Sequence, residues 1–157
     1  MKAFRSKVLL LLVLTLFSWS FASAQIKFNV GVSELATFTP KDFLFDLHFD
    51  CNVSTSLFGV RVGFEDVKIK NWYSSIYVGE RHDFSQQFSI MGTIGMGYMS
   101  PFNEHEKGCM YGELGANLRY IFAPPHFYFD IGYVANLLYV KERPNYQGVR
   151  LSWGVFF

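Results

Sequence analysis

The chain has 157 residues, of which 50% are hydrophobic and 19% aromatic, and its formal net charge is +1. This length allows one domain, and so high an aromatic content favours strands and interfaces between water and an apolar phase. The near-zero charge gives no electrostatic reason to bind nucleic acid, which argues against that class of function.

The first 24 residues have the pattern of a secretory signal peptide. Three basic residues lie within the first seven positions, an apolar run follows over 8–17, and 22–24 reads Ala-Ser-Ala, a small-residue cleavage site. The apolar run is too short to cross a bilayer. We therefore expect cleavage of 1–24 and a mature domain over 25–157, which carries 11 basic and 13 acidic residues.

The rest of the chain alternates between apolar and polar residues with period two, as strands with one apolar face do. Eight segments show the pattern, and each has about the length of a tilted membrane strand. They cover 26–33, 43–53, 58–65, 72–81, 87–98, 111–122, 127–137 and 148–157.

The connections between these segments fall into two classes. Those after the second, fourth and sixth segments are short, and those after the first, third, fifth and seventh are mostly longer and more polar, the longest over 99–109. Short periplasmic turns that alternate with longer extracellular loops are typical of outer-membrane proteins. We therefore predict an all-β fold, an eight-stranded antiparallel up-and-down transmembrane β-barrel in the outer membrane of a Gram-negative cell, with both termini in the periplasm.

A soluble, lipocalin-like barrel would also alternate, with its apolar face inward. The glycines favour the inverted arrangement, because the narrow interior of an eight-stranded barrel needs small residues, and glycine on a solvated outer face would only weaken the strands. Ten of the 13 glycines lie on the polar face: Gly31, Gly59, Gly63, Gly79, Gly95, Gly97, Gly115, Gly132, Gly148 and Gly154.

The same polar face carries charges of both signs in the middle of strands. We predict that they form a charge network in the lumen, because buried charges must be paired to be tolerated. Its expected members are Asp46, His48, Asp50, Arg61, Glu113, Arg119, Asp130 and Arg150. The row Asp46, His48 and Asp50 also has residue types that bind metals or polarise a base, but the network is the better reading. We expect no catalytic residue, no metal and no cofactor.

Aromatic residues gather at the segment ends, where two interfacial girdles are expected. The predicted girdles consist of Trp72, Tyr98, Tyr139 and Tyr146 at the loop end, and of Phe88, Tyr120, Phe122, Phe127, Trp153 and Phe157 at the turn end. The two cysteines, Cys51 and Cys109, are expected at opposite rims of the barrel, which argues against a disulfide.

The last segment resembles the C-terminal signature of bacterial outer-membrane proteins. Its alternating apolar positions are Val149, Leu151, Trp153, Val155 and the terminal Phe157. With the signal peptide and the eight-strand pattern, the chain resembles small barrels of the OmpA/OmpX type. The resemblance implies that the outer-membrane assembly machinery reads this segment, and it implies no particular activity.

The function expected from the sequence is non-enzymatic, a structural or surface-interaction role of a monomer whose partners are outer-membrane lipid, lipopolysaccharide and the assembly machinery. One alternative is a lipid-modifying enzyme similar to the lipid A deacylases. Its only loop-side histidine would be His105, with Ser100 the nearest serine. Another alternative is a narrow, porin-like channel or small-ligand carrier, although a lumen crossed by ion pairs conducts poorly.

Overall fold

The computed structural model describes residues 26–38, 43–65, 71–101, 108–122, 126–139 and 145–157. The predicted signal peptide lies outside these residues, as does His105. None of the described residues belongs to a helix long and apolar enough to cross a membrane. The strands are β1 (Ile26–Thr37), β2 (Phe43–Val53), β3 (Ser56–Glu65), β4 (Asn71–Asp83), β5 (Phe88–Met99), β6 (Cys109–Phe122), β7 (Phe127–Leu138) and β8 (Tyr146–Phe156).

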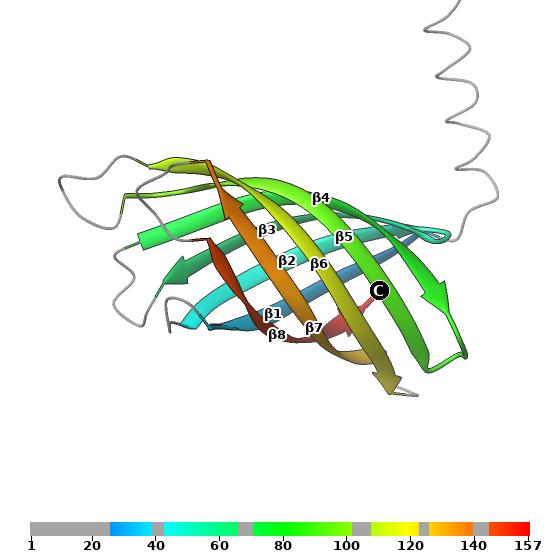
Figure 1. Cartoon of the computed structure of the whole chain (residues 1–157). Helices are drawn as coiled ribbons and strands as arrows, with labels where there is room; N and C mark the ends of the chain where they lie inside the picture. Colours follow the sequence, from blue (N-terminus) through cyan, green and yellow to red (C-terminus); the bar gives the residue numbers. More distant parts are fainter. Residues whose placement is uncertain (1–25, 39–42, 66–70, 102–107, 123–125, 140–144) are drawn as a thin grey trace, which may run out of the picture.

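The strands form a closed barrel in which each strand pairs with the next one along the chain and β8 pairs with β1. All eight pairings are antiparallel, so the predicted up-and-down eight-stranded barrel is confirmed. Figure 1 shows the β2–β3 and β4–β5 turns at the same end of the barrel as the C-terminus. We call this the turn end and the opposite one the loop end.

The hydrogen-bond register fixes how far the strands are staggered. The register line that starts at Ile26 passes once around the barrel and returns to β1 at Ala36, ten residues closer to the loop end. A stagger of this size over eight strands tilts each strand by about 40° from the barrel axis. Moving by one residue along a strand then changes the height along the barrel axis by about 2.5 Å. Moving to the paired residue of the next strand, from β7 to β8 or from β8 to β1, raises the height by about 3 Å toward the loop end.

The faces of the strands follow the predicted alternation. In β2, Leu44, Asp46, His48, Asp50 and Asn52 are buried in the lumen, whereas the phenylalanines between them are exposed. The exposed large hydrophobic residues of every strand lie on the opposite face from the lumen. The polarity of the barrel is therefore the inverse of that of a soluble barrel.

The sequence misplaced some ends of the strands. The segment 34–37 was expected in a loop but continues β1, because Leu35 and Thr37 are buried in the lumen. Tyr146 was expected in the outer girdle, but it opens β8 with its side chain buried in the lumen. The other girdle residues at the loop end, Trp72, Tyr98 and Tyr139, are exposed.

Two lumenal glycines of β3 make room for tyrosine rings from the neighbouring strand β4. Gly59 pairs across the sheet with Tyr77, and Gly63 pairs with Tyr73. A Cβ atom added at either glycine would overlap the ring of its partner. The two tyrosine rings can therefore lie over the adjacent backbone and fill part of the lumen, which explains why glycine is needed at these two positions.

Candidate functional site in the barrel lumen

The middle of the lumen holds four charged side chains, which we call the upper ionic layer: Asp46, Arg61, Glu113 and Arg150. Glu113 lies between the two arginines, with its Oε1 2.6 Å from Arg61 Nη1 and 3.1 Å from Arg150 Nη1. Asp46 faces the same arginines from β2, at 3.3 Å from Arg61 Nε and 3.9 Å from Arg150 Nε. All four residues are buried, and their charges balance.

Hydroxyl groups complete the surroundings of the Asp46 carboxylate. Tyr73 Oη donates a hydrogen bond of 2.8 Å to Asp46 Oδ2, and Ser33 Oγ donates to Oδ1. A buried carboxylate needs such donors to replace the water that it loses. The layer is therefore a hydrogen-bonded unit to which β1, β2, β3, β4, β6 and β8 all contribute.

Three further charged side chains, Asp50, Arg119 and Asp130, form the lower ionic layer nearer the turn end. Arg119 binds Asp130 in a bidentate pair, with both N–O distances at 2.7 Å, and its Nη2 lies 4.0 Å from Asp50 Oδ2. The guanidinium also stacks over the ring of Tyr128, 4.0 Å from its centroid. Tyr77 Oη donates to Asp50. With two acids and one arginine, this layer carries one more negative than positive charge.

His48 connects the two layers. Its Nδ1 lies 3.6 Å from Asp46 Oδ1 in the upper layer. Its Nε2 lies 2.6 Å from the hydroxyl of Tyr128, whose ring carries Arg119 of the lower layer. The histidine is buried and its Nδ1 also lies 3.5 Å from Ser33 Oγ, so contacts within the lumen orient its ring.

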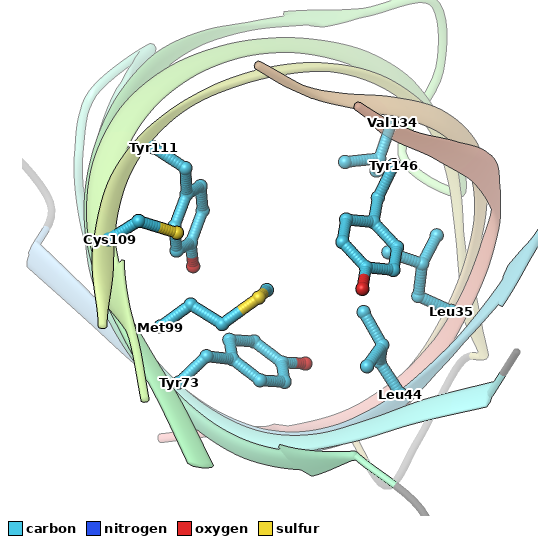
Figure 2. Close-up of a cluster of buried hydrophobic side chains, with 8 residues drawn as sticks. All are labelled: Leu35, Leu44, Tyr73, Met99, Cys109, Tyr111, Val134 and Tyr146. Carbon is cyan, nitrogen blue, oxygen red and sulfur yellow. The ribbon is translucent and has the colours of Figure 1, made fainter. Parts of the chain in front are cut away.

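An apolar cluster fills the lumen above the upper ionic layer, at the loop end. Figure 2 shows its side chains projecting inward from around the barrel wall, and we call it the apolar cap: Leu35, Leu44, Tyr73, Met99, Cys109, Tyr111, Val134 and Tyr146. The sequence did not predict this cluster. Leu44 and Tyr111 lie on the polar face of the alternating pattern, but nothing in the sequence indicated that the lumen changes from ionic to apolar along its length.

The structure brings all eight residues of the predicted lumenal network into the lumen and into contact with at least one other member. Among the described residues, no group of three or more His, Cys, Asp or Glu side chains is arranged to hold a metal ion. Cys51 and Cys109 are both free thiols, which confirms that they form no disulfide with each other. Ser100, the serine considered for an enzyme, is buried and accepts a 2.9 Å hydrogen bond from the backbone of Trp72.

The residues of the C-terminal pattern lie on the outer side of β8, opposite the lumenal Arg150 and Ser152. The exposed side chains include Trp153 and Phe157. The backbone N–H of Phe157 donates a 2.8 Å hydrogen bond to Phe28, which continues the closure of β8 on β1 to the last residue.

No protein-family model matches this chain, and no curated protein matches it by sequence. Solved structures do match its fold. The N-terminal β-barrel domain of Pseudomonas aeruginosa OprF is 12% identical, and the match covers 86% of this chain and 100% of that domain with a TM-score of 0.71. Neisserial surface protein A is 14% identical over 85% of this chain and 97% of its own, with a TM-score of 0.52.

A de novo designed transmembrane β-barrel also matches, at 12% identity over 83% of this chain and 95% of the design, with a TM-score of 0.51. At such low identities the likeness shows a common fold, the eight-stranded barrel of outer-membrane proteins. It does not carry over what any of these proteins binds.

Proposed function

We propose that this chain is an integral outer-membrane β-barrel with a structural or surface-interaction role. The observation that carries the proposal is the inverted polarity of the barrel. Leu47 and Ile76 on the outer face are each 60% exposed, whereas Glu113 and Arg119 in the lumen are each 1% exposed. Such a surface is unfavourable in water and suits the hydrocarbon of a bilayer.

The height of the apolar surface supports the same proposal. In β7 the outward residues are apolar or aromatic from Phe127 to Leu137. Ten residues at the tilt of this barrel span about 25 Å, which is the height of the apolar band of outer-membrane barrels. Exposed aromatic residues such as Trp72 and Phe88 lie near the two edges of this band, where amphipathic rings favour the membrane interface.

Export and assembly complete the proposal. The predicted signal peptide would direct the chain across the inner membrane, and the pattern from Val149 to Phe157 would be read by the outer-membrane assembly machinery. Outer-membrane lipid and lipopolysaccharide would then surround the barrel. The loop end would face the cell exterior, as longer loops do in this class.

We further infer that the barrel is not a channel. The upper ionic layer, the lower ionic layer and the apolar cap are stacked along the lumen, and each contains side chains from several strands. An eight-stranded barrel has an interior just wide enough for side chains to fill. An ion would have to break buried pairs and then cross the cap, so ion flow should be negligible.

The test uses the full-length chain expressed in a Gram-negative host. The protein should fractionate with the outer membrane, should run differently on a gel before and after boiling, and should give no single-channel steps in planar bilayers. A protein that folds as a monomer in buffer without detergent would refute membrane insertion. Regular conductance steps would refute the closed lumen and favour the channel.

A further inference from the structure

The outer surface of β7, β8 and β1 carries polar side chains within the apolar band, and one of them is a carboxylate that no described residue pairs. We call this surface the β8 face; its polar residues are Glu34, Tyr133 and Gln147. Building on the membrane location proposed above, we propose that two copies of this chain associate through the β8 face, and that Glu34 of each copy accepts hydrogen bonds from the partner copy.

Glu34 points away from the lumen, because its neighbours Ser33 and Leu35 are buried inside the barrel. It lies three residues below the end of β1, and its cross-strand neighbours Phe45 and Leu151 are apolar. The described residues supply no hydrogen bond or ion pair for its carboxylate. An acidic side chain in the apolar band is costly unless a partner satisfies it.

Donors for this carboxylate lie on the other side of β8. Tyr133 Oη donates a 2.7 Å hydrogen bond to Gln147 Oε1. The bond orients the Gln147 amide and leaves its Nε2 without an acceptor among the described residues. The β8 face therefore has an unsatisfied acceptor on β1 and unsatisfied donors on β8, beside β7.

The heights of these groups match a two-fold axis parallel to the membrane normal, the symmetry of two copies inserted in the same direction. Tyr133 pairs with Val149, and Val149 pairs with Ala36, two residues above Glu34. With the rise along and between strands given above, Glu34 and Tyr133 lie within about 2 Å of the same height. A rotation of 180° about this axis brings the β1 side of one copy opposite the β7 side of the other. Glu34 of one copy therefore faces Tyr133 and Gln147 of the partner copy.

The distances are also compatible. A barrel of this stagger has a radius of about 8 Å, so β1 and β7 recede by only about 2 Å each from a plane touching β8. Two β8 strands packed through Val149 and Leu151, about 10 Å apart, leave roughly 14 Å between Glu34 and the partner's Tyr133 backbone. Extended glutamate and tyrosine side chains span that distance with one hydrogen bond, in which the Tyr133 hydroxyl donates its proton to the partner's Glu34 and accepts from Gln147 Nε2 in place of its present bond to Gln147 Oε1.

The apolar part of the β8 face has both a depression and a projecting side chain. A depression of about 480 Å³ lies toward the turn end, and its lining includes Val30, Val32, Val155 and Phe129. Trp153 stands at the edge of this depression and is 48% exposed. Within the barrel Trp153 pairs with Val32, so the exposed ring and the depression form one continuous apolar surface on the β8 face.

The test is cross-linking of single cysteines in outer membranes. In a background with Cys51→Ser and Cys109→Ala, Val149→Cys places a thiol near the proposed axis. Ile94→Cys, on the outer face of β5, is the matched control because Ile94 is also an outward apolar residue at mid-band, and at 58% exposure it is more accessible than the half-buried Val149. A short bis-maleimide should yield a dimer from Val149→Cys, and the Ile94→Cys protein should remain monomeric.

The contribution of the polar contact is measured by adding Glu34→Leu to the Val149→Cys protein. Dimer yield should fall at least tenfold although the gel shift on boiling shows a folded barrel. Equal cross-linking at 149 and 94 would overturn the proposal, as would a yield that Glu34→Leu leaves unchanged. Native mass spectrometry that finds a monomer with lipid A bound through Glu34 would also overturn it. In each of these three cases the protein would still be inserted in the membrane, so failure of the proposed dimer is distinct from failure of the proposed function.

Discussion

Glu113→Gln is the most direct test of the lumenal network, because one carboxylate serves two arginines. Its Oε1 lies 2.6 Å from Arg61 and 3.1 Å from Arg150, and the side chain is 1% exposed. The amide has the same shape as the carboxylate but no charge. The upper ionic layer would then hold two arginines against Asp46 alone, with one uncompensated positive charge out of reach of water.

Removal of one partner from a buried ion pair costs about 3–5 kcal/mol. Glu113→Gln breaks two ion pairs, but Asp46 still faces both arginines, at 3.3 and 3.9 Å. The loss of unfolding free energy should therefore stay in the range for one broken pair and should not be twice as large. We expect this loss in the free energy of unfolding by urea, measured on barrel refolded in lipid vesicles through tryptophan fluorescence. Arg150→Met should recover part of it, because it removes the charge that Glu113→Gln leaves unpaired.

Glu80→Gln is the matched control. Glu80 is exposed and accepts a 2.9 Å hydrogen bond from Ser56, so the same change of charge should cost about 0–1 kcal/mol. If Glu113→Gln is as mild as Glu80→Gln, the lumen is hydrated enough to screen its charges. The ion pairs would then not stabilise the barrel, and the argument for a closed lumen would weaken with them.

Three further outcomes are expected. Gly59→Ala should destabilise the barrel by about 1–3 kcal/mol, because the new methyl group meets the tyrosine ring over it, whereas Gly92→Ala, which meets nothing within 4 Å, should be neutral in the same urea assay. Tyr128→Phe should cost about 1–3 kcal/mol by removing the hydroxyl 2.6 Å from His48 Nε2, and a smaller loss would mean that water takes its place. Deletion of Phe157 should lower the amount of protein in the outer membrane far more than it lowers the stability of refolded barrel; equal, small effects would mean that the ring is only an anchor.

The architecture could be predicted from the sequence because its signal is local. In a strand that separates two environments, successive side chains point to opposite faces. The alternate polar residues around Asp46 are therefore enough to show which face of that strand lines the lumen. The assignment needs no knowledge of which strands are neighbours, since sequential strands pair in an up-and-down barrel. This is why the facing of the strands was correct although several strand ends were not.

The contacts inside the lumen could not be predicted from the sequence, because they depend on the register between strands. Asp46 and Glu113 share two arginines, although they come from strands that are not neighbours, and only the stagger of ten residues brings them to the same level. The apolar cap arises in the same way, from single residues near the ends of several strands. Tyr146 was misassigned for this reason: an aromatic residue at a strand end suits the girdle or the lumen, and one residue of register decides between them.

Most charges of the lumen are paired within the barrel, and the apolar cap lies between the ionic layers and the loop end. If the lumen is closed, as proposed above, its ion pairs would serve the stability of the barrel. Recognition of a partner would then take place on the outer surface of the barrel or at its loop end. On the outer wall, Glu34 carries a charge that no described residue pairs, and this is the feature on which the proposed dimer rests.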